Sequence, residues 1–191
     1  MRKLKKKDDD PIDNVIYDNF VVSLTPLLRN LGFTPNMVTI SSIIIAFIGI
    51  YYLTHKNLVI FSILFAIAYI LDNIDGNMAR LYNMQSKLGD FLDHCGDIVK
   101  ILVLLYALYD KFNLMKHPNI IILIVVLMFL TCFHIGCQEN LTKYDGNNGT
   151  LSLVKMLCKD KQHLIKYTRY FGPGSFILYI TIISCYIVKL S

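Results

Sequence analysis

Four long apolar stretches and one shorter one divide this chain, and they constrain its fold more than any other feature of the sequence. The stretches cover approximately residues 37–53, 58–71, 89–109, 120–133 and 176–188. A helix needs roughly 20 predominantly apolar residues to cross a bilayer. The second and third stretches reach that length only if the Asp-bearing segment between them is helical as well. The pattern therefore predicts an all-α, polytopic membrane helical bundle of five transmembrane helices, or of six if a short helix near 151–157 also crosses.

The composition favours a membrane protein over a nucleic-acid-binding one. Charged residues make up only 17% of the chain and hydrophobic residues 54%, whereas soluble domains hold roughly 25% charged residues. The basic residues behind the net charge of +5 lie between the apolar stretches and form no basic stripe. We therefore expect the lipid bilayer to be a partner of this chain, and we expect no nucleic acid.

The N-terminal region carries no long apolar stretch and is predicted in two parts. Residues 1–14 are predicted to be a charged cytoplasmic tail, and residues 15–191 a single membrane domain. Within 15–31, apolar residues recur at steps of three and four, which favours an amphipathic helix on the membrane surface, bent near Pro26. The alternative is a linker that packs on the bundle.

The distribution of Lys and Arg predicts the orientation of the bundle. With five spans and a cytoplasmic N-terminus, 14 of these residues lie in cytoplasmic segments and only four on the other side. The positive-inside rule favours this arrangement, which places the Asp-bearing turn on the cytoplasmic face. The glycosylation sequons at Asn140 and Asn148 would then stay unmodified. The membrane would be of the endoplasmic-reticulum type in a eukaryotic or viral setting and the plasma membrane in a prokaryote.

The cysteines are few and scattered along the chain. They form no CxxC pair, and their number is odd: Cys95, Cys132, Cys137, Cys158 and Cys185. Such a set predicts ordinary reduced core residues and no disulfide framework.

The segment from Asp72 to Asp97 carries the residues most suited to chemistry. On a helix, its first group shares one face, at steps of three, four, seven and eight: Asp72, Asp75, Gly76, Ala79 and Arg80. A second group, spaced by four, shares one face of the next helix: Gly89, Asp93 and Asp97. Two helices joined by a short turn can therefore present four carboxylates to one point.

Four like charges at the edge of hydrocarbon repel one another and are costly to desolvate. Divalent cations relieve both problems, and a carboxylate set without His or Cys suits Mg²⁺ or Mn²⁺. Two such ions would clamp the attacking and leaving oxygens of a phosphoryl displacement. Gly76 and Ala79 leave their helix face bare for a phosphate-bearing ligand, and Arg80 supplies a fork of donors for phosphate oxygens.

Two other interpretations of the carboxylates are open. They could belong to a structural ion-pair network, but Arg80, Lys87 and Lys100 are too few cations for the acidic groups around them. They could instead form the cation relay of a non-enzymatic membrane transporter. A relay has no nucleotide to hold and would not need Gly76, Ala79 and Arg80.

The same residues match the fingerprint of a known family. The CDP-alcohol phosphotransferases of phospholipid synthesis carry the pattern D-x2-D-G-x2-A-R-x8-G-x3-D-x3-D. It is met without departure by Asp72, Asp75, Gly76, Ala79, Arg80, Gly89, Asp93 and Asp97. The chain therefore resembles these integral-membrane enzymes, whose arrangement of membrane helices is also similar.

The resemblance implies a role for each position. Asp72 and Asp93 would bridge two metal ions, and Asp75 would complete one metal site. Asp97 would ligate the other ion and would also act as the general base. Residues expected around the CDP moiety, as the resemblance implies, are Asn36, Thr39, Gly76, Ala79, Arg80, Ser86 and Gly89. The first two match an N-x-x-T element of the family, and their alternative role is a simple helix-start signal.

The implied reaction is attack by an alcohol hydroxyl, deprotonated by Asp97, on the phosphorus of a CDP-linked alcohol, with release of CMP. The run from Ser86 to Asp97 resembles choline and ethanolamine phosphotransferases, and we first favour that branch. The chain length is closer to synthases that use CDP-diacylglycerol, such as phosphatidylinositol or phosphatidylglycerophosphate synthases, which are the alternative. The expected partners are a CDP-linked alcohol donor and an alcohol or lipid acceptor, with a homodimer as one assembly to test.

Several residues outside the fingerprint are secondary candidates. Lys100 lies on the same helix face as Asp93 and Asp97, and we expect it to balance the carboxylates rather than to bind an anionic acceptor. His94 is a candidate second-layer contact to a metal ligand. The acceptor side is predicted to include residues at the end of the fourth span: His134, Gln138 and Glu139.

Overall fold

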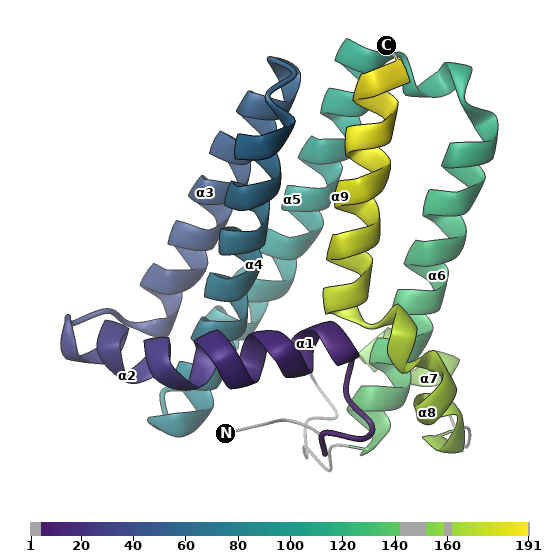
Figure 1. Cartoon of the computed structure of the whole chain (residues 1–191). Coiled ribbons are helices and arrows are strands. Elements are labelled where there is room, and N and C mark those ends of the chain that lie inside the picture. The colour runs from purple at the N-terminus through teal and green to yellow at the C-terminus, as the bar shows by residue number, and fades with distance from the viewer. Residues whose placement is uncertain (1–4, 142–151, 159–161, 191) are drawn as a thin grey trace.

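Five long helices run side by side in the computed structural model, which describes residues 5–141, 152–158 and 162–190 (Figure 1). They are α3 (Pro35–Thr54), α4 (Leu58–Leu81), α5 (Lys87–Phe112), α6 (Pro118–Leu141) and α9 (Pro173–Leu190). Four helical segments are long and apolar enough to cross a membrane: Pro35–Thr54, Leu58–Leu81, Pro118–Leu141 and Ile165–Leu190. The predicted all-α membrane bundle is confirmed.

α5 is the long helix that does not meet the same test of length and hydropathy within the described residues. It has 26 residues and runs beside α3 and α4 (Figure 1), but its first half carries the charges that the site requires. The predicted five spans therefore correspond to five long helices, of which four are identified by their apolar composition.

Capping residues explain where the helices that carry the site begin. The hydroxyl of Thr34 accepts from the backbone N–H of Met37, and Pro35 provides the first turn of α3. Asn57 caps α4. The Ser86 hydroxyl accepts from the N–H of Gly89, 3.0 Å away, at the start of α5. The caps at Thr34 and Ser86 lie at the end of the bundle that carries the Asp-bearing turn, whereas Asn57 caps α4 at its other end.

The core lies between the helices, and the outer faces are apolar. Buried residues of the main core come from all five long helices and include Leu53, Phe61, Leu104, Leu127 and Ile180. Many large apolar side chains point outward instead, as Ile44, Phe47, Val59, Ile63 and Val125 do. An apolar exterior around an apolar core is the arrangement expected of helices in lipid.

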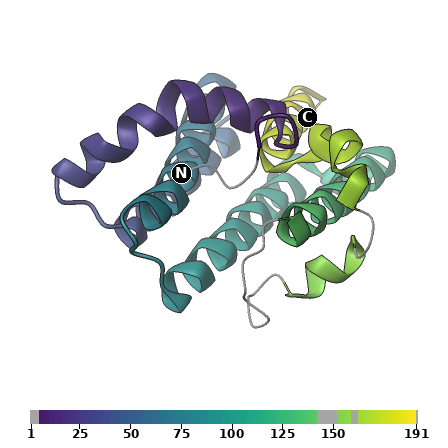
Figure 2. The same cartoon turned by 90° about the horizontal axis from the view of Figure 1, so that it is seen from below.

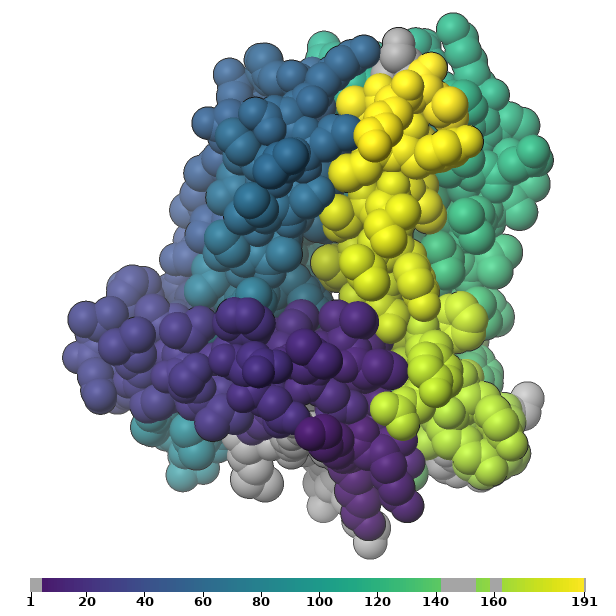
Figure 3. Space-filling view, in the orientation of Figure 1, coloured from purple at the N-terminus to yellow at the C-terminus, as the bar shows by residue number. Residues whose placement is uncertain are grey.

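The N-terminal segment forms a nearly continuous helix that crosses one end of the bundle (Figures 1 and 2). It consists of α1 (Pro11–Ile16), a π-helical turn η1 (Tyr17–Val21) and α2 (Val22–Asn30), with Pro26 inside α2. The space-filling view shows this helix lying against the lower ends of α3 and α4 (Figure 3). The predicted helix is present, and it packs on the bundle.

The predicted boundary of the tail is wrong, because helix α1 already begins at Pro11. Asp10 is fully buried and caps two helices at once. Its carboxylate accepts from the backbone N–H of Ile12 at 2.7 Å and from that of Ser175, near the start of α9, at 2.9 Å. Gly172 and Gly174 carry no side chain that would collide with Asp10 and Asp13 at this junction. Asp10 is thus a structural residue rather than part of a solvated tail.

The short segments after α6 correct two further predictions. The helix expected near 151–157 exists as α7 (Ser152–Leu157), but six residues are too few to cross a bilayer, so it is not a sixth span. The prediction that all cysteines are reduced is wrong for Cys137 and Cys158, which form a disulfide. Gly136 explains the close approach, because a side chain there would collide with the backbone of Val154 in α7. The chain then continues through η3 (Gln162–Leu164), α8 (Ile165–Thr168) and η4 (Arg169–Phe171) into α9.

Candidate active site

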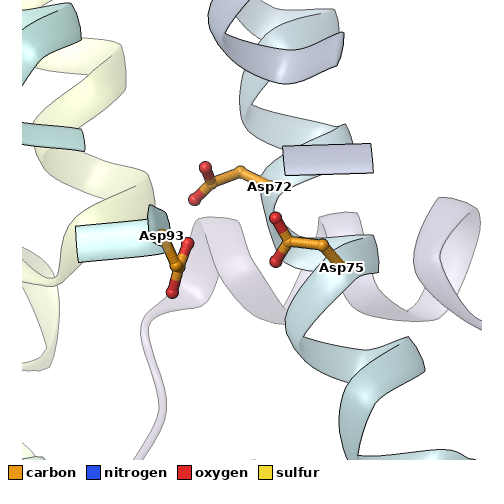
Figure 4. A group of neighbouring side chains, drawn as sticks. All are labelled: Asp72, Asp75 and Asp93. Carbon is orange, nitrogen blue, oxygen red and sulfur yellow. The ribbon is translucent and has the colours of Figure 1, made fainter. Parts of the chain in front are cut away.

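Three of the four predicted metal ligands converge where α4 ends and α5 begins. Asp72 and Asp75 lie on α4 and Asp93 on α5, and their carboxylates point toward one another (Figure 4). One oxygen from each lies within 4.8 Å of the others. The helical spacing that the sequence indicated therefore produces the expected convergence, because both segments are helical through the motif.

We call Asp72, Asp75 and Asp93 the acidic cluster. Helix α3 places polar side chains next to it. The buried hydroxyl of Thr39 donates to the carboxylate of Asp75. Ser42, one turn further along α3, lies with its hydroxyl 3.5 Å from Asp72. Ser42 was not among the predicted residues, although its position three residues after Thr39 places it on the same helix face. Thr39 therefore contacts Asp75, which is a metal-ligand candidate.

Asp97, the fourth predicted ligand, is turned toward a lysine. Lys100, one turn further along α5, lies 2.7 Å from Asp97 and 2.6 Å from Asp72, measured from its Nζ to a carboxylate oxygen of each. Lys100 is buried, whereas about half of the Asp97 side chain is exposed (51%). The ion pairs agree with the predicted charge-balancing role of Lys100.

The glycine and arginine positions of the fingerprint also lie together. The guanidinium of Arg80 folds back over Gly76, so that a side-chain carbon placed on Gly76 would lie 3.2 Å from Nη1 of Arg80. A side-chain carbon on Gly89 would lie 3.0 Å from both the Asn36 side-chain oxygen and the Ser86 hydroxyl. The starts of α3 and α5 therefore meet at residues that the sequence had grouped as nucleotide-binding.

The secondary candidates fall in different places. His94 lies 3.4 Å from Asp90 and 3.5 Å from Asp93, measured between ring nitrogens and carboxylate oxygens, so it does contact a metal-ligand candidate. His134 is fully buried, and its Nδ1 lies 3.0 Å from the Thr168 hydroxyl. The structure therefore packs His134 against α8, and Glu139 is buried as well.

An apolar cavity of about 230 Å³ adjoins the site. Its lining is contributed by α3, α4, α5, α6 and the start of α9, and includes Ala46, Phe65, Ile101, Met128 and Phe176. Asp97 and Lys100 also line it. Sequence reasoning missed the contributions of Tyr69, Thr131 and Cys132 to this cavity, because nothing in an apolar stretch marks which side chains surround a void.

The residues present fit a divalent metal ion. The donors are carboxylate oxygens from two helices, and no thiolate or imidazole belongs to the three-residue cluster. Hard cations such as Mg²⁺ and Mn²⁺ prefer this donor set. Because Asp75 is buried and Asp72 nearly so (12% of its side chain exposed), water can offset little of the repulsion among these charges. A cation would.

The fold and this site define a membrane protein with a cluster of carboxylates, suited to a metal ion, at one end of a helical bundle. The family model of the CDP-alcohol phosphatidyltransferases matches residues 33–189, which is most of the chain. The protein belongs to this family.

Two curated relatives align with part of the chain. An archaetidylinositol phosphate synthase of Pyrococcus horikoshii is 33% identical over 81 residues, which cover 42% of this chain and 43% of the relative. A CDP-diacylglycerol–serine O-phosphatidyltransferase of Helicobacter pylori is 38% identical over 65 residues, covering 34% of this chain and 27% of the relative. The aligned part thus spans less than half of either relative. No solved structure matches the chain.

These relatives bear on two earlier interpretations. Neither is a choline or ethanolamine phosphotransferase by name, so the comparisons favour the CDP-diacylglycerol alternative over the branch that the sequence first suggested. Neither the family match nor the relatives support a homodimer.

Proposed function

We propose that this protein transfers a phosphatidyl-type group from a CDP-linked lipid donor to the hydroxyl of a small polar alcohol, with release of CMP. The observation that carries the proposal is the convergence of Asp72, Asp75 and Asp93, at the family's fingerprint positions, next to an apolar cavity. A cation transporter would need the carboxylates, but it would need neither the cavity nor Gly76 and Arg80 at the fingerprint spacing from them. Membership of the family supports the transferase over the transporter.

The acidic cluster would hold the metal, with Asp97 as a further ligand. When bound, Mg²⁺ or Mn²⁺ neutralises charge on the diphosphate of the donor and on the departing CMP. Thr39 orients the carboxylate of Asp75 from the side of α3, while the Ser42 hydroxyl donates to the Ala68 carbonyl and lies 3.5 Å from Asp72. The guanidinium of Arg80 lies over Gly76 and offers N–H donors to phosphate oxygens of the donor.

Asp97 is the proposed general base. It is the fingerprint carboxylate outside the three-residue cluster, and half of its side chain is exposed. A base must reach the hydroxyl proton of an incoming acceptor, and an exposed carboxylate at the mouth of the site can do so. The ammonium of Lys100, 2.7 Å from Asp97, holds this carboxylate in place beside the acidic cluster.

The cavity supports a lipid as one substrate. Its lining is almost entirely apolar, and it meets the site at Asp97 and Lys100. Because its lining is apolar, the cavity can accept an acyl chain from the bilayer without leaving buried polar groups unpaired. A CDP-lipid would thus place its diphosphate at the acidic cluster while its chain enters the cavity. The two relatives, named for an inositol phosphate and a serine product, support a polar acceptor.

The site is proposed to face the cytoplasm. An excess of Lys and Arg in the segments at the end of the bundle that carries the acidic cluster supports this orientation. The host membrane depends on the cell that contains the protein.

A substrate screen tests the proposal. Detergent-solubilised protein with Mn²⁺ or Mg²⁺ is given CDP-diacylglycerol and separately serine, inositol phosphate, inositol or glycerol phosphate, and CMP is measured. Parallel reactions contain CDP-choline or CDP-ethanolamine with diacylglycerol. CMP release with CDP-diacylglycerol and one polar acceptor is the expected result. Release only from CDP-choline or CDP-ethanolamine would overturn the donor assignment, and no release from any donor would overturn the activity.

A further inference from the structure

Lys100 is the buried cation at the centre of the site. Its Nζ lies 2.6 Å from Asp72, 2.7 Å from Asp97 and 3.3 Å from the Ser42 hydroxyl. An ammonium group has three N–H donors. These three contacts, from α3, α4 and α5, can therefore use all of them.

The position of this ammonium coincides with a place that a metal ion would need. A cation bound to Oδ1 of Asp72 and Oδ1 of Asp97, the two oxygens that Nζ contacts, would lie where Nζ now lies. Oxygen ligands lie roughly 2.0–2.6 Å from Mg²⁺ or Ca²⁺, so an ion and an ammonium cannot occupy this space together. The three oxygens of Asp72, Asp75 and Asp93, by contrast, converge within 4.8 Å of one another.

We infer that Lys100 is a positioning residue that occupies one of the two cation positions of the site, and that it must leave Asp72 and Asp97 before a second ion binds. The inference rests on the proposed function, because it assumes that Asp97 serves as a metal ligand. The first ion binds to the acidic cluster, and the second competes with an internal cation.

The structure provides a place for the displaced side chain. Lys100 and Asp97 both line the apolar cavity, which has room beside them. The four-carbon stem of lysine can lie along apolar surface while its ammonium turns toward a polar group. An anionic phosphate of the donor, entering near Arg80, would be such a group. Lys100 would then couple the arrival of the second ion to the arrival of the substrate.

A purely structural ion pair makes a different prediction. In that case Lys100 would hold α4 and α5 together, and its removal would lower stability without strengthening the binding of any ion. A metal titration without nucleotide distinguishes the two possibilities. This measurement does not depend on catalysis.

The test is a Mn²⁺ titration of EDTA-treated, solubilised full-length protein, followed by electron paramagnetic resonance. Wild type is compared with Lys100→Met, which keeps the stem without the charge, and with Lys100→Arg, which keeps the charge. Lys111→Met is the matched control, because Lys111 lies on the same helix, is exposed and pairs with Asp110. We expect Lys100→Met to bind the second ion about tenfold or more tightly than wild type, since a competing charge is removed. Lys100→Arg and Lys111→Met should not show this gain.

A measurement on the wild-type protein covers the case in which Lys100→Met does not fold. Lysine reactivity toward an amine-acylating reagent is measured by mass spectrometry with and without saturating Mn²⁺. We expect Mn²⁺ to increase the labelling of Lys100 severalfold and to leave Lys111 unchanged. Equal labelling of Lys100 in both states, or equal Mn²⁺ binding by wild type and a folded Lys100→Met, would overturn the inference.

These outcomes are distinct from failure of the proposed function. If the second ion binds more tightly to Lys100→Met but no CDP-linked donor yields CMP, the role of Lys100 stands and the transferase proposal falls. If CMP is released and the ion binding of Lys100→Met is unchanged, the transferase proposal stands and the role of Lys100 falls.

Discussion

The hydroxyl of Thr39 on α3 donates a hydrogen bond to the carboxylate of Asp75 on α4, and both side chains are buried. This contact orients one ligand of the acidic cluster from a neighbouring helix. Partners of this kind are typically worth 10- to 100-fold in metal affinity or activity. Thr39 of the N-x-x-T element thus has a structural role at the acidic cluster.

Replacement of Thr39 by valine should therefore weaken the metal site. We expect Thr39→Val to lower Mn²⁺ affinity by about tenfold, whereas Thr39→Ser should stay close to wild type because it keeps the donor. Thr181→Val is the matched control, since that hydroxyl donates to the Ile177 carbonyl within its own helix, α9. Mn²⁺ titration measures all three variants. Equal affinity for Thr39→Val and wild type would remove this role.

The stability of the protein should depend on pH through Asp13. This side chain accepts from the Tyr69 hydroxyl at 2.6 Å, and burial together with the neighbouring Asp10 raises its pKa from 3.8 to about 7. The folded state then binds a proton that the unfolded state releases between about pH 4 and pH 7. This contribution to stability is complete below pH 4 and is lost as the pH rises through 7, by up to about 4 kcal/mol.

Asp13→Asn should remove that part of the pH dependence, because an amide keeps the acceptor without a charge. Relative to wild type, the variant should melt at higher temperature at pH 8 and at about the same temperature at pH 4.5. Asp18→Asn is the control, since Asp18 is exposed and pairs with Lys6. Thermal unfolding of the solubilised proteins at both pH values gives the comparison. A difference between Asp13→Asn and wild type that does not change with pH would contradict the account.

The disulfide predicts a specific pattern of cysteine reactivity. Alkylation of the unfolded, unreduced protein should modify Cys95, Cys132 and Cys185 and leave Cys137 and Cys158 joined. Closing a loop of this length is worth roughly 3 kcal/mol in the chain-entropy model, and the sequence separation is 21. Reduction should therefore lower the melting temperature, and Cys158→Ser should lack that response. Alkylation of all five cysteines without reductant would show that the bond is not formed.

The orientation of the bundle can be tested with the sequons already in the chain. Asn140 is at the end of α6 and donates to the Lys155 carbonyl, while Asn148 lies outside the described residues. In a microsomal translation assay, neither asparagine should be glycosylated, and a spaced sequon appended after α9 should be. Glycosylation at Asn140 or Asn148 would place the acidic cluster on the non-cytoplasmic side.

The helices and the site were predictable from sequence where the pattern was local. Asp72 and Asp75 lie on one face of a helix because their spacing sets that face, and Asp93 joins them because the turn between α4 and α5 is short. The caps at Thr34 and Ser86 are likewise local signals. Such features depend on a few neighbouring residues, so the sequence carries them directly.

The features that escaped prediction join residues far apart in the chain. Asp10 looked like one of several charges in a tail, and only the packing of α1 against α9 makes it a buried cap. Cys137 and Cys158 carry no spacing signal, and α7 brings them together by folding back against α6. The cavity beside Asp97 is a property of several helices at once and leaves no mark on any one of them.

The most direct test of the central claim is CMP release from CDP-diacylglycerol, measured for wild type, Asp93→Asn, Asp97→Asn and the control Asp110→Asn. We predict metal-dependent release by wild type and Asp110→Asn, because Asp110 pairs with Lys111 away from the site. Asp93→Asn should fail through loss of a metal ligand. Asp97→Asn should lose about 10²-fold or more in turnover while Mn²⁺ still binds to the acidic cluster. Undiminished CMP release by Asp93→Asn and Asp97→Asn would contradict the account.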